Sequence, residues 1–322
     1  MKHLNHRLAA VVLAAASCSC FGQGYPSKPV TIIVPFSVGT PQDILSRVAG
    51  KAMGERMGAS IIVDNRAGAS GSIGNGMVGK AAPDGYTLLM TSTSFIISKA
   101  LNPTFTYEPL KQYSPIALLA TGDMGFFVSA DTPAQSFGEV LSLAKAKPGS
   151  LNYSSPGNGT PQHLAMELFK LESGINVQHI PYKDNTGSVN AVAAGQVNLL
   201  ISPIVASMLG LAKTGKLRIV AVMNDERLPA LPAVPTFKEA GFTGIDVHVW
   251  YGLLGPSGLP APILSRLNTE INASIAQADV KDIFEKQSLR LIGGTPERLA
   301  GLMKSETDRW NRVVKEAGIK AE

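Results

Sequence analysis

The sequence contains very little cysteine. Cys18 and Cys20 are the only two in 322 residues, and both lie close to the N-terminus. They belong to a segment with a basic start, an apolar run over residues 8–16 and small residues up to Gly22, which is typical of a secretory signal peptide. Cleavage after Gly22 leaves a mature chain without cysteine, which excludes disulfide bonds and thiol chemistry in an exported protein.

An alternative is that Cys18 carries a lipid anchor. Residues 15–17, Ala-Ala-Ser, lack the leucine that is usual before a lipid-modified cysteine. We therefore favour a cleaved signal peptide over residues 1–22. The later sequence has no apolar run long enough for a membrane helix, since the nearest one, VNLLISPIVASMLGLA, is interrupted by Pro203. A soluble protein outside the cytoplasm is expected.

Clustered charge and catalytic motifs are also missing. The net charge is +5, with basic residues scattered along the chain, which argues against nucleic-acid binding and is compatible with a small anionic ligand. There is no GxSxG elbow and no HExxH pair. GNGMVG, at 74–79, does not directly follow a strand and is not read as a dinucleotide fingerprint. The histidines lack the spacing of metal ligands, so neither a metal nor a cofactor is expected.

Strands and helices alternate along the chain, which predicts an α/β fold with parallel sheets. The predicted strands are 30–36, 60–65, 86–92, 114–120, 125–130, 151–155, 177–182, 197–202, 217–223 and 247–256. The predicted helices are 41–57, 136–147, 161–173, 186–194, 204–213, 261–276 and 296–317. Their grouping indicates two doubly wound lobes with a ligand cleft between them: residues 23–122 plus 245–322, and residues 123–244.

The tetrapeptide Gly-Thr-Pro-Gln occurs twice, at 39–42 and at 159–162, each time between a predicted strand and a predicted helix. Threonine is a favoured N-cap and proline a favoured first helical residue, so both copies are expected to begin helices. In the first copy Asp43 stands where it would complete a capping box; in the second that position is His163. His163 is expected to be a neutral ring facing the site, or exposed, because a cation is disfavoured at a helix start.

Both copies fall where ligands bind in open α/β sheets, beyond the carboxyl ends of strands. A helix start offers free N–H groups and a partial positive charge, which hold carboxylate or phosphate without arginine. The alternative is that Thr-Pro merely begins two ordinary helices. Two copies at corresponding places favour a shared anion site, suited to a ligand with acidic groups at both ends.

Several long motifs resemble those of the Bug family, the periplasmic receptors of tripartite tricarboxylate transporters. They are YPSKPVTIIVPFSVGTPQDILSR, VDNRAGASGSIGNGMVGKAAPDGYTLLM, YSSPGNGTPQHLAMELF, HIPYKDNTGSVNAVAAGQVN and VWYGLLGPSGLPAPILSRLN. The resemblance implies a Venus-flytrap fold, a small carboxylate ligand, and delivery to one small and one large membrane subunit. It also implies that residues 36–43 and 155–163 bind a ligand carboxylate, partly through backbone groups and ordered water. A periplasmic monomer is expected.

The chain departs from the family pattern where carboxylates or glycine are usual. Loss of carboxylates near the cleft suits a dianion and disfavours amino-acid ligands. The departures are Thr40, Asp184, Asn190, Asn198 and Ser202.

The predicted ligand-binding residues are hydroxyls, loop residues and ring nitrogens near the two helix starts and the late strand. His248 is included as a hydrogen-bond donor, whereas Trp250 is expected in the core. The apolar Val38, Ile96 and Phe126 would allow an aromatic, phthalate-type dicarboxylate. The full set is Phe36, Val38, Gly39, Thr40, Asp43, Ser94, Ser155, Asn158, Gly159, Thr160, His163, Ser202 and His248.

Two alternative functions remain. One is a secreted α/β hydrolase or transferase that uses serine and histidine, against which the missing elbow motif argues. The other is a receptor that presents its ligand-bound form to a sensor. The favoured interpretation is a binding protein that performs no chemistry on its ligand.

Overall fold

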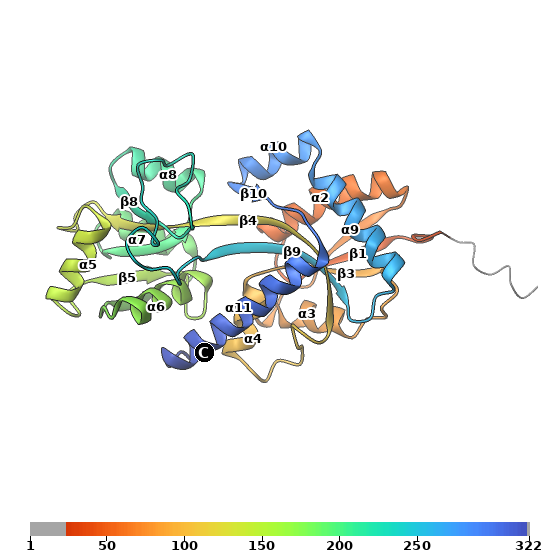
Figure 1. Ribbon diagram of the computed structural model, residues 1–322, viewed down its shortest axis with the longest axis horizontal. Coiled ribbons are helices and arrows are strands. Elements are labelled where there is room, and N and C mark those ends of the chain that lie inside the picture. The colour runs from red at the N-terminus through yellow and green to blue at the C-terminus, as the bar shows by residue number, and fades with distance from the viewer. Residues whose placement is uncertain (1–23, 321–322) are drawn as a thin grey trace, which may run out of the picture.

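The computed structural model describes residues 24–320, so the predicted signal peptide and the alternative lipid anchor at Cys18 lie outside the described residues. Within this range the chain forms two α/β lobes joined by two long strands, β4 (Tyr113–Ser129) and β9 (His248–Pro256) (Figure 1). Lobe 1 contains the first three strands, and lobe 2 contains the strands between β4 and β9. The predicted two-lobed α/β architecture is confirmed.

The strands form one continuous sheet that passes from lobe 1 to lobe 2 through β4. Its order is β2-β1-β3-β9-β4-β7-β5-β6, with β8 and β10 also paired to β4. Apart from the two joining strands, the bounds are β1 Val30–Val34, β2 Ile61–Asn65, β3 Thr87–Ser92, β5 Asn152–Ser155, β6 Gln178–Pro181, β7 Leu199–Pro203, β8 Leu217–Val222 and β10 Leu289–Leu291.

The prediction of parallel sheets is only partly right. β1 pairs in parallel with β2 and β3, and β5 pairs in parallel with β6 and β7. All pairs made by β4 and β9 are antiparallel. The two strands predicted at 114–120 and 125–130 are also one strand: up to Asp123 it pairs with β9, and from Met124 it pairs with β7. The Gly122-Asp123 pair has the composition of a turn, but here it marks the passage between lobes.

Helices cover the faces of the sheet in each lobe. Their bounds are α2 Pro41–Met57, α3 Ser72–Gly79, α4 Ser94–Leu101, α5 Phe137–Ala146, α6 Pro161–Ser173, α7 Asn185–Ala193, α8 Ala206–Lys213, α9 Ala261–Ile275, α10 Ala278–Lys286 and α11 Pro296–Glu316. A short 3₁₀ turn spans Ala69–Gly71. GNGMVG lies inside α3 rather than at a strand-to-helix turn. Between residues 24 and 320, no helix combines the length and apolarity needed to cross a bilayer.

The hydrophobic core is continuous through both lobes. Its largest cluster joins lobe 1 residues such as Phe95 to an aromatic group in lobe 2 that includes Phe126, Phe137 and Phe169. In that group Phe126 meets Phe169 edge to face, with ring centroids 5.5 Å apart. Trp250 is also fully buried, as predicted. The continuity of this core fixes the two joining strands to both lobes.

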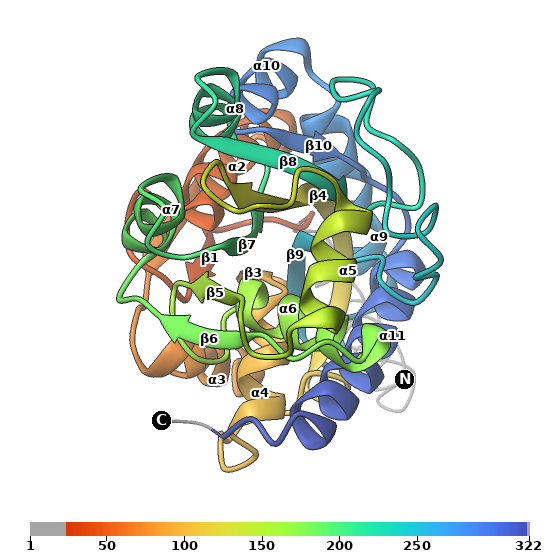
Figure 2. The ribbon, with the colours of Figure 1, turned by 90° about the vertical axis from the view of Figure 1, so that its left-hand side faces the viewer.

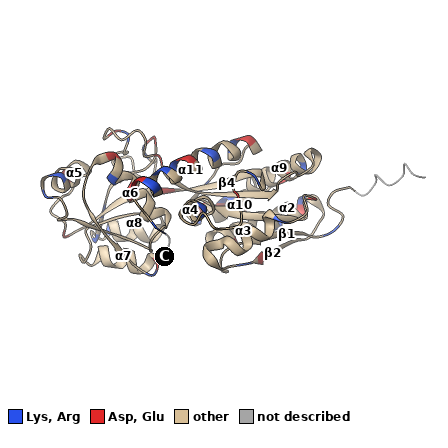
Figure 3. Cartoon of the chain, turned by 90° about the horizontal axis from the view of Figure 1, so that it is seen from below, with Lys and Arg blue, Asp and Glu red and all other residues tan. Residues whose placement is uncertain are grey.

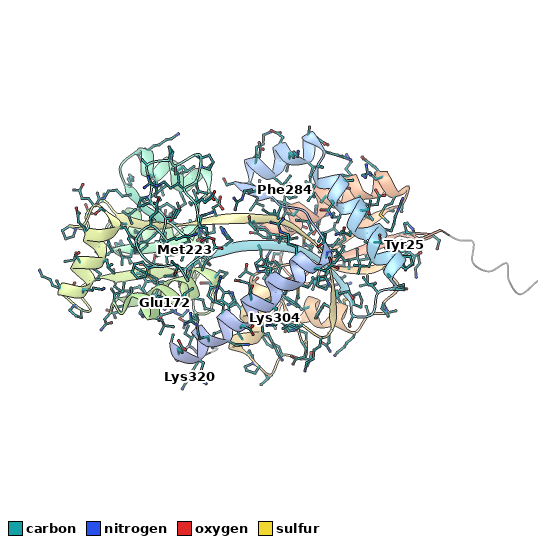
Figure 4. All side chains as sticks on the ribbon, viewed as in Figure 1. Tyr25, Glu172, Met223, Phe284, Lys304 and Lys320 are labelled. Carbon is teal, nitrogen blue, oxygen red and sulfur yellow. The ribbon has the colours of Figure 1, made fainter. Side chains whose placement is uncertain are left out.

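Helix α11 is a third segment that reaches both lobes (Figures 1 and 3). Near its start, Leu299 packs over β9, where a Cβ added to Gly252 would lie 3.0 Å from the leucine side chain. Near its end, Arg312 Nη2 lies 2.8 Å from Glu172 Oε1 of α6 in lobe 2. Figure 4 labels Glu172 in lobe 2 and Lys304 near the middle of α11. The C-terminal helix therefore braces lobe 2 against lobe 1.

Candidate ligand-binding site

Strand direction brings the two Gly-Thr-Pro-Gln loops to the face between the lobes. β4 runs from lobe 1 into lobe 2, and β9 is antiparallel to it. β3 is antiparallel to β9 and parallel to β1, so β1 and β3 end facing lobe 2. β7 is antiparallel to β4 and parallel to β5, so β5 and β7 end facing lobe 1. Figure 2 views the molecule from the lobe 2 end, with α5, α6, α7 and α8 around the strands of that lobe. The loops after β1 and β5 thus leave the carboxyl ends of opposed strands.

The two loops have the same backbone conformation. Gly39 and Gly159 have φ of 85° and 73°, a region that favours glycine. The next residues, Thr40 and Thr160, have φ/ψ of −71°/158° and −73°/156°. Both helices then begin at proline, as predicted. The repeat in the sequence is therefore a repeat of structure.

The threonine hydroxyls hold the preceding turn in each loop. Thr40 Oγ1 donates to the carbonyl of Ser37, and Thr160 Oγ1 donates to the carbonyl of Gly157, both at 2.9 Å. Only Thr160 also accepts a hydrogen bond from its helix, from the His163 amide at 3.4 Å. Side-chain capping by Thr40 was expected and is not present.

The third helical residue turns back onto the loop glycine in both copies. Asp43 Oδ2 accepts from the Gly39 amide at 2.9 Å, and His163 Nδ1 accepts from the Gly159 amide at 3.0 Å. The predicted capping box is therefore wrong, because Asp43 bonds the residue before the cap and not the cap itself. His163, which was expected to leave the second loop without such a contact, makes the equivalent one.

Asp43 is a buried anion paired with a cation. Its side chain is 3% exposed, and Arg47 Nη2 lies 2.8 Å from Oδ1. Burial opposes ionisation, but hydrogen bonds from Arg47 and from the Gly39 amide outweigh it and lower the pKa of the carboxyl. The first loop therefore contains a negative charge that is already balanced within α2.

His163 is a buried neutral ring. Burial, together with the nearby His179, lowers its pKa to about 4. Its ring stacks on His179 with centroids 4.1 Å apart, and His179 stacks on Tyr153 at 4.7 Å. Because Nδ1 accepts the Gly159 amide, the proton of the neutral ring is on Nε2. The prediction was a neutral ring facing the site or an exposed ring; the ring is buried, and burial rather than the helix start is the main cause of its low pKa.

A polar network supports the second loop from behind. The Tyr153 hydroxyl and Lys170 Nζ both contact Glu167 Oε1, the latter at 2.7 Å. Ser155 Oγ lies 2.7 Å from His179 Nε2 and accepts from the Gly157 amide at 3.2 Å. Ser155 is fully buried. It supports the loop, and its surface is not open to a ligand.

On the lobe 1 side, hydroxyls follow β3 next to the first loop. Gln42 Nε2 donates to Ser92 Oγ at 3.0 Å, and Ser92 Oγ lies 2.8 Å from Ser94 Oγ. Ser94 is the first residue of α4 and is only partly buried. The structure thus brings Ser94 together with the first loop.

The other predicted contacts fall into exposed and buried groups. Val38 is 71% exposed at the tip of the first loop, and Asn158 is exposed in the second. Phe36 is half-buried. Ser202 is fully buried, and its hydroxyl has no hydrogen-bond partner within residues 24–320.

Two residues proposed as an apolar surface for an aromatic ligand are core residues instead. Ile96 is 1% exposed and Phe126 is fully buried. Both face away from solvent because α4 and β4 pack their apolar sides into the interlobe core. Of the three residues, only Val38 offers apolar surface.

The second loop also touches the opposite lobe. A Cβ built on Gly159 would lie 2.2 Å from Leu101 Cδ1, at the end of α4 in lobe 1. A Cβ on Gly39 would meet nothing within 4 Å. The second loop therefore has lobe 1 as its neighbour, whereas Gly39 faces open space.

His248 lies elsewhere, in a charged cluster where the joining strands pass between lobes. Its Nε2 is 2.8 Å from Asp246 Oδ1, and its Nδ1 is 3.5 Å from Asp123 Oδ1. Burial lowers its pKa, but the two aspartates outweigh this effect and raise the pKa to about 9. Asp123 also meets Arg290 of β10 at 3.4 Å and Asn224 of lobe 2 at 2.8 Å. The ring is therefore a cation within the hinge.

Two large hollows lie away from both loops. One, of about 650 Å³, lies over the outer side of α2 and β2 and includes Arg47 and Val63. The other, of about 600 Å³, lies between β10 and the segment that contains Leu228 and Leu231. Neither is lined by residues 37–40 or 157–160. The candidate site is therefore defined by the opposed helix starts and not by the volume of a hollow.

Sequence reasoning missed the residues that support these loops. Gln42 was part of the repeated motif but had no assigned role, and its hydrogen bond to Ser92 joins positions 50 apart. His179 and Glu167 reach the second loop from β6 and α6. Only Glu167 carried a sequence signal, since it lies one helical turn after His163 on the same face.

The fold and the opposed loops define a two-lobed solute-binding protein. The profile of the tripartite tricarboxylate transporter family receptor matches residues 45–319. The chain belongs to this family, and the resemblance to Bug proteins is confirmed. It is therefore a receptor of the periplasmic solute-binding class and not an enzyme.

Similar proteins match over nearly the whole chain. A UPF0065 protein from the tcbD-tcbE intergenic region of Pseudomonas sp. (strain P51) is 36% identical over 98% of this chain and 94% of its own length. The periplasmic binding protein BugD is 28% identical, with a TM-score of 0.73 over 92% of this chain and 100% of that chain.

Two similar structures contain dicarboxylates. Rpa4515 of R. palustris, solved with adipate, is 31% identical, with a TM-score of 0.75 over 92% of this chain and 99% of that chain. MatC (Rpa3494) from Rhodopseudomonas palustris, solved with bound malate, is 30% identical, with a TM-score of 0.73 over 90% of this chain and 100% of that chain.

Proposed function

We propose that this receptor captures a small dicarboxylate between the loops that precede α2 and α6. The observation that carries the proposal is the matching pair of Gly-Thr-Pro-Gln loops at opposed strand ends. In each, the first turn of a helix has amide groups without a carbonyl partner inside the helix, which attract an anion. Ser94 adds a hydroxyl from lobe 1.

The charge balance around these loops supports an acidic ligand. Asp43 is neutralised by Arg47, and His163 is uncharged at neutral pH. An ionised carboxylate would therefore meet helix starts without a net opposing charge from either side chain. The same balance offers no unpaired carboxylate to an ammonium group, which supports the expectation that amino acids bind poorly.

An aliphatic dicarboxylate suits the site better than an aromatic one. The two similar structures named above contain adipate and malate, both aliphatic. Of the three apolar residues considered for an aromatic ring, Ile96 and Phe126 are buried in the core. Of these three residues, a phthalate-type ligand could contact only Val38. Phthalate therefore distinguishes an aliphatic from an aromatic specificity in a binding panel.

The lobes would close on the ligand by rotation about the joining segments. We place lobe 1 at residues 23–122 with 245–322, and lobe 2 at residues 123–244. Asp123 lies at one passage, and residues 244–247 precede β9 at the other. Because β4 and β9 connect the two lobes within one continuous sheet, closure is expected to bend these strands and not to break the hydrogen bonds between paired strands.

The family supports a cellular context for this function. We propose a periplasmic monomer, released by cleavage after Gly22, that delivers its ligand to the small and large membrane subunits of a tripartite tricarboxylate transporter. The alternative of a ligand-presenting receptor for a sensor uses the same closed form. It would be favoured if deletion of the membrane subunits left a ligand response intact.

Isothermal titration calorimetry with the mature protein tests the ligand. The panel is malate, adipate, phthalate, aspartate and acetate. We expect saturable binding of malate or adipate, at least tenfold weaker binding of phthalate, and none of aspartate. Absence of saturable binding by every carboxylate would overturn the proposal.

A further inference from the structure

We propose that His163 is a positioning residue of the second loop, and that an uncharged acceptor at this position allows the loop to hold an anion. The proposal rests on the dicarboxylate function given above and assigns a role to a residue that need not touch the ligand. It begins from one hydrogen bond that occurs in both loops, from the glycine amide to the third residue of the helix.

The hydrogen bond from the glycine amide fixes the backbone at this glycine, which would otherwise be flexible. Gly39 and Gly159 both adopt positive φ, and each amide is held by a side chain four residues later. Without that acceptor, the amide would have to find water or rotate, and the helix start would lose its orientation. Asp43 and His163 therefore perform the same structural task with different chemistry.

The residue one helical turn after each acceptor also differs between the two helices, and its charge suits the acceptor. Asp43 is followed by Arg47, which pairs with it at 2.8 Å. The corresponding residue after His163 is Glu167, whose Oε1 contacts Tyr153 and Lys170. A carboxylate at position 163 would meet another carboxylate at the next turn instead of an arginine. The second loop is thus built for a neutral acceptor.

The surroundings of His163 hold the ring neutral and in one tautomer. The charged or titratable groups packed around it are His179 from β6, Tyr153 from β5, and Glu167 and Lys170 from α6 itself. His163 also lines a hollow of about 420 Å³ that includes Asn158 and Lys320. Stacking fixes the ring plane, and the Gly159 amide requires a lone pair on Nδ1.

The consequence for an anion is electrostatic. The first turn of α6 carries a partial positive charge that is available to a ligand only if no fixed negative charge lies beside it. A neutral imidazole supplies the lone pair without that charge. In the first loop the same condition is met differently, since the negative charge of Asp43 is balanced by Arg47.

Three substitutions separate the acceptor from its charge, with malate and adipate as probes at pH 7.5. His163→Asn keeps a neutral acceptor, because an amide oxygen reaches the place of Nδ1, and should bind within about threefold of wild type. His163→Leu removes the acceptor and should weaken binding about tenfold. His163→Asp restores the acceptor but adds a charge, and should weaken binding about 100-fold.

The pH profile distinguishes this role from a merely structural one. The affinity of His163→Asp, divided by that of wild type at the same pH, should rise as the pH falls from 7.5 to 5 and the new carboxyl begins to gain a proton. The same ratio for His163→Asn should stay constant. Asp308→Asn is the control away from both loops, because its carboxylate pairs with Lys304 on the exposed surface of α11 and removal of that charge should not change binding. Thermal unfolding of each variant checks that the fold is retained.

A second measurement needs no substitution. The ¹⁵N spectrum of wild-type protein should show His163 with hydrogen on Nε2 and no titration between pH 5 and 8. A charged His163 in that range, or His163→Asn as weak as His163→Leu in a folded protein, would overturn the proposal. If wild type binds neither probe, the dicarboxylate function fails first, and the NMR result still decides the state of the ring.

Discussion

The face between the lobes and the hinge beside it are built from opposite chemistry. Around the two loops, donors are backbone amides and hydroxyls, the histidine is neutral, and the one buried aspartate is paired within its own helix. At the hinge, His248 is a cation between two aspartates, and arginines from β10 and α11 surround it. Ion pairs thus hold segments of this protein together, whereas uncharged dipoles would contact the charged ligand under the proposed function.

The proposed binding of a charged ligand would explain this difference between the loops and the hinge. A lysine or arginine in the site would form an ion pair in the empty receptor or bind any anion. The backbone amides at a helix start form no such ion pair before the ligand binds. At the hinge, charge pairs join segments that are distant in sequence, such as Asp123 and His248, and so link the two passages between lobes.

The largest effect is expected from Thr160→Pro. Proline removes both the amide that faces Gly157 and the hydroxyl that donates to the Gly157 carbonyl. Calorimetry should show dicarboxylate affinity reduced by more than about 100-fold, or about 3 kcal/mol. Thr40→Pro should act alike.

Thr295→Pro is the control for this prediction. Thr295 also precedes a helix-starting proline, Pro296, but it begins α11 away from both loops. Equal losses at Thr160 and Thr295 would show that the effect is a general one on helix starts and not on the site.

Gly159→Ala and Gly39→Ala should differ although both glycines have positive φ. Each alanine is strained by about 1–2 kcal/mol in this region. At Gly159 the new methyl group also collides with Leu101 of lobe 1, while at Gly39 it enters open space. Affinity should therefore fall at least tenfold further for Gly159→Ala. Leu101→Ala added to it should recover part of the difference, and no recovery would contradict the role of this contact.

His248→Gln should change stability and its pH dependence but not affinity. The folded pKa of His248, about 9, lies above its ordinary value near 6.5. Its contribution is therefore fully present below about pH 6.5 and is lost as the pH rises through 9, about 3 kcal/mol in all. Urea unfolding should show this decline in wild type and a flatter profile in the variant. A loss of ligand affinity above about threefold would return His248 to the binding site.

The smallest effects are expected from single hydroxyls. Ser94→Ala should weaken binding by about 1–2 kcal/mol if its hydroxyl bonds a charged ligand oxygen. Ser155→Ala should have an effect of similar size through the loop, because its hydroxyl contacts Gly157 and His179. Calorimetry on both variants separates direct from indirect action: only Ser155→Ala should also lower the melting temperature. Unchanged affinity in both variants would move the site elsewhere.

Much of the fold was predictable because its local signals are strong. The helices at 41–57 and 161–173 begin at Thr-Pro and end before Gly58 and Gly174, which adopt the left-handed conformation of a helix end. α3, α4 and α10 were missed because they are short, and α3 contains three glycines. β4 was divided in two because Gly122-Asp123 resembles a turn when its partners on β9 are unknown.

The positions of the loops were predictable, but their internal contacts were not. A repeated motif after a strand indicates where a helix begins. It does not indicate that Asp43 bonds Gly39 and Arg47 and not Thr40, because this depends on the direction of the side chains. The same holds for His248, whose place was inferred from its strand alone. Asp123 is 125 residues away in sequence, and nothing local connects the two.

The brace formed by α11 has a consequence for the work of opening. Separation of the lobes must pull Glu172 away from Arg312, whose side chains are 33% and 47% exposed. Water and salt screen such a pair, so its rupture costs no more than about 1 kcal/mol. The C-terminal helix therefore holds the two lobes together only weakly at this point. If the lobes close on a ligand as proposed, the ligand rather than α11 would determine the balance between open and closed forms.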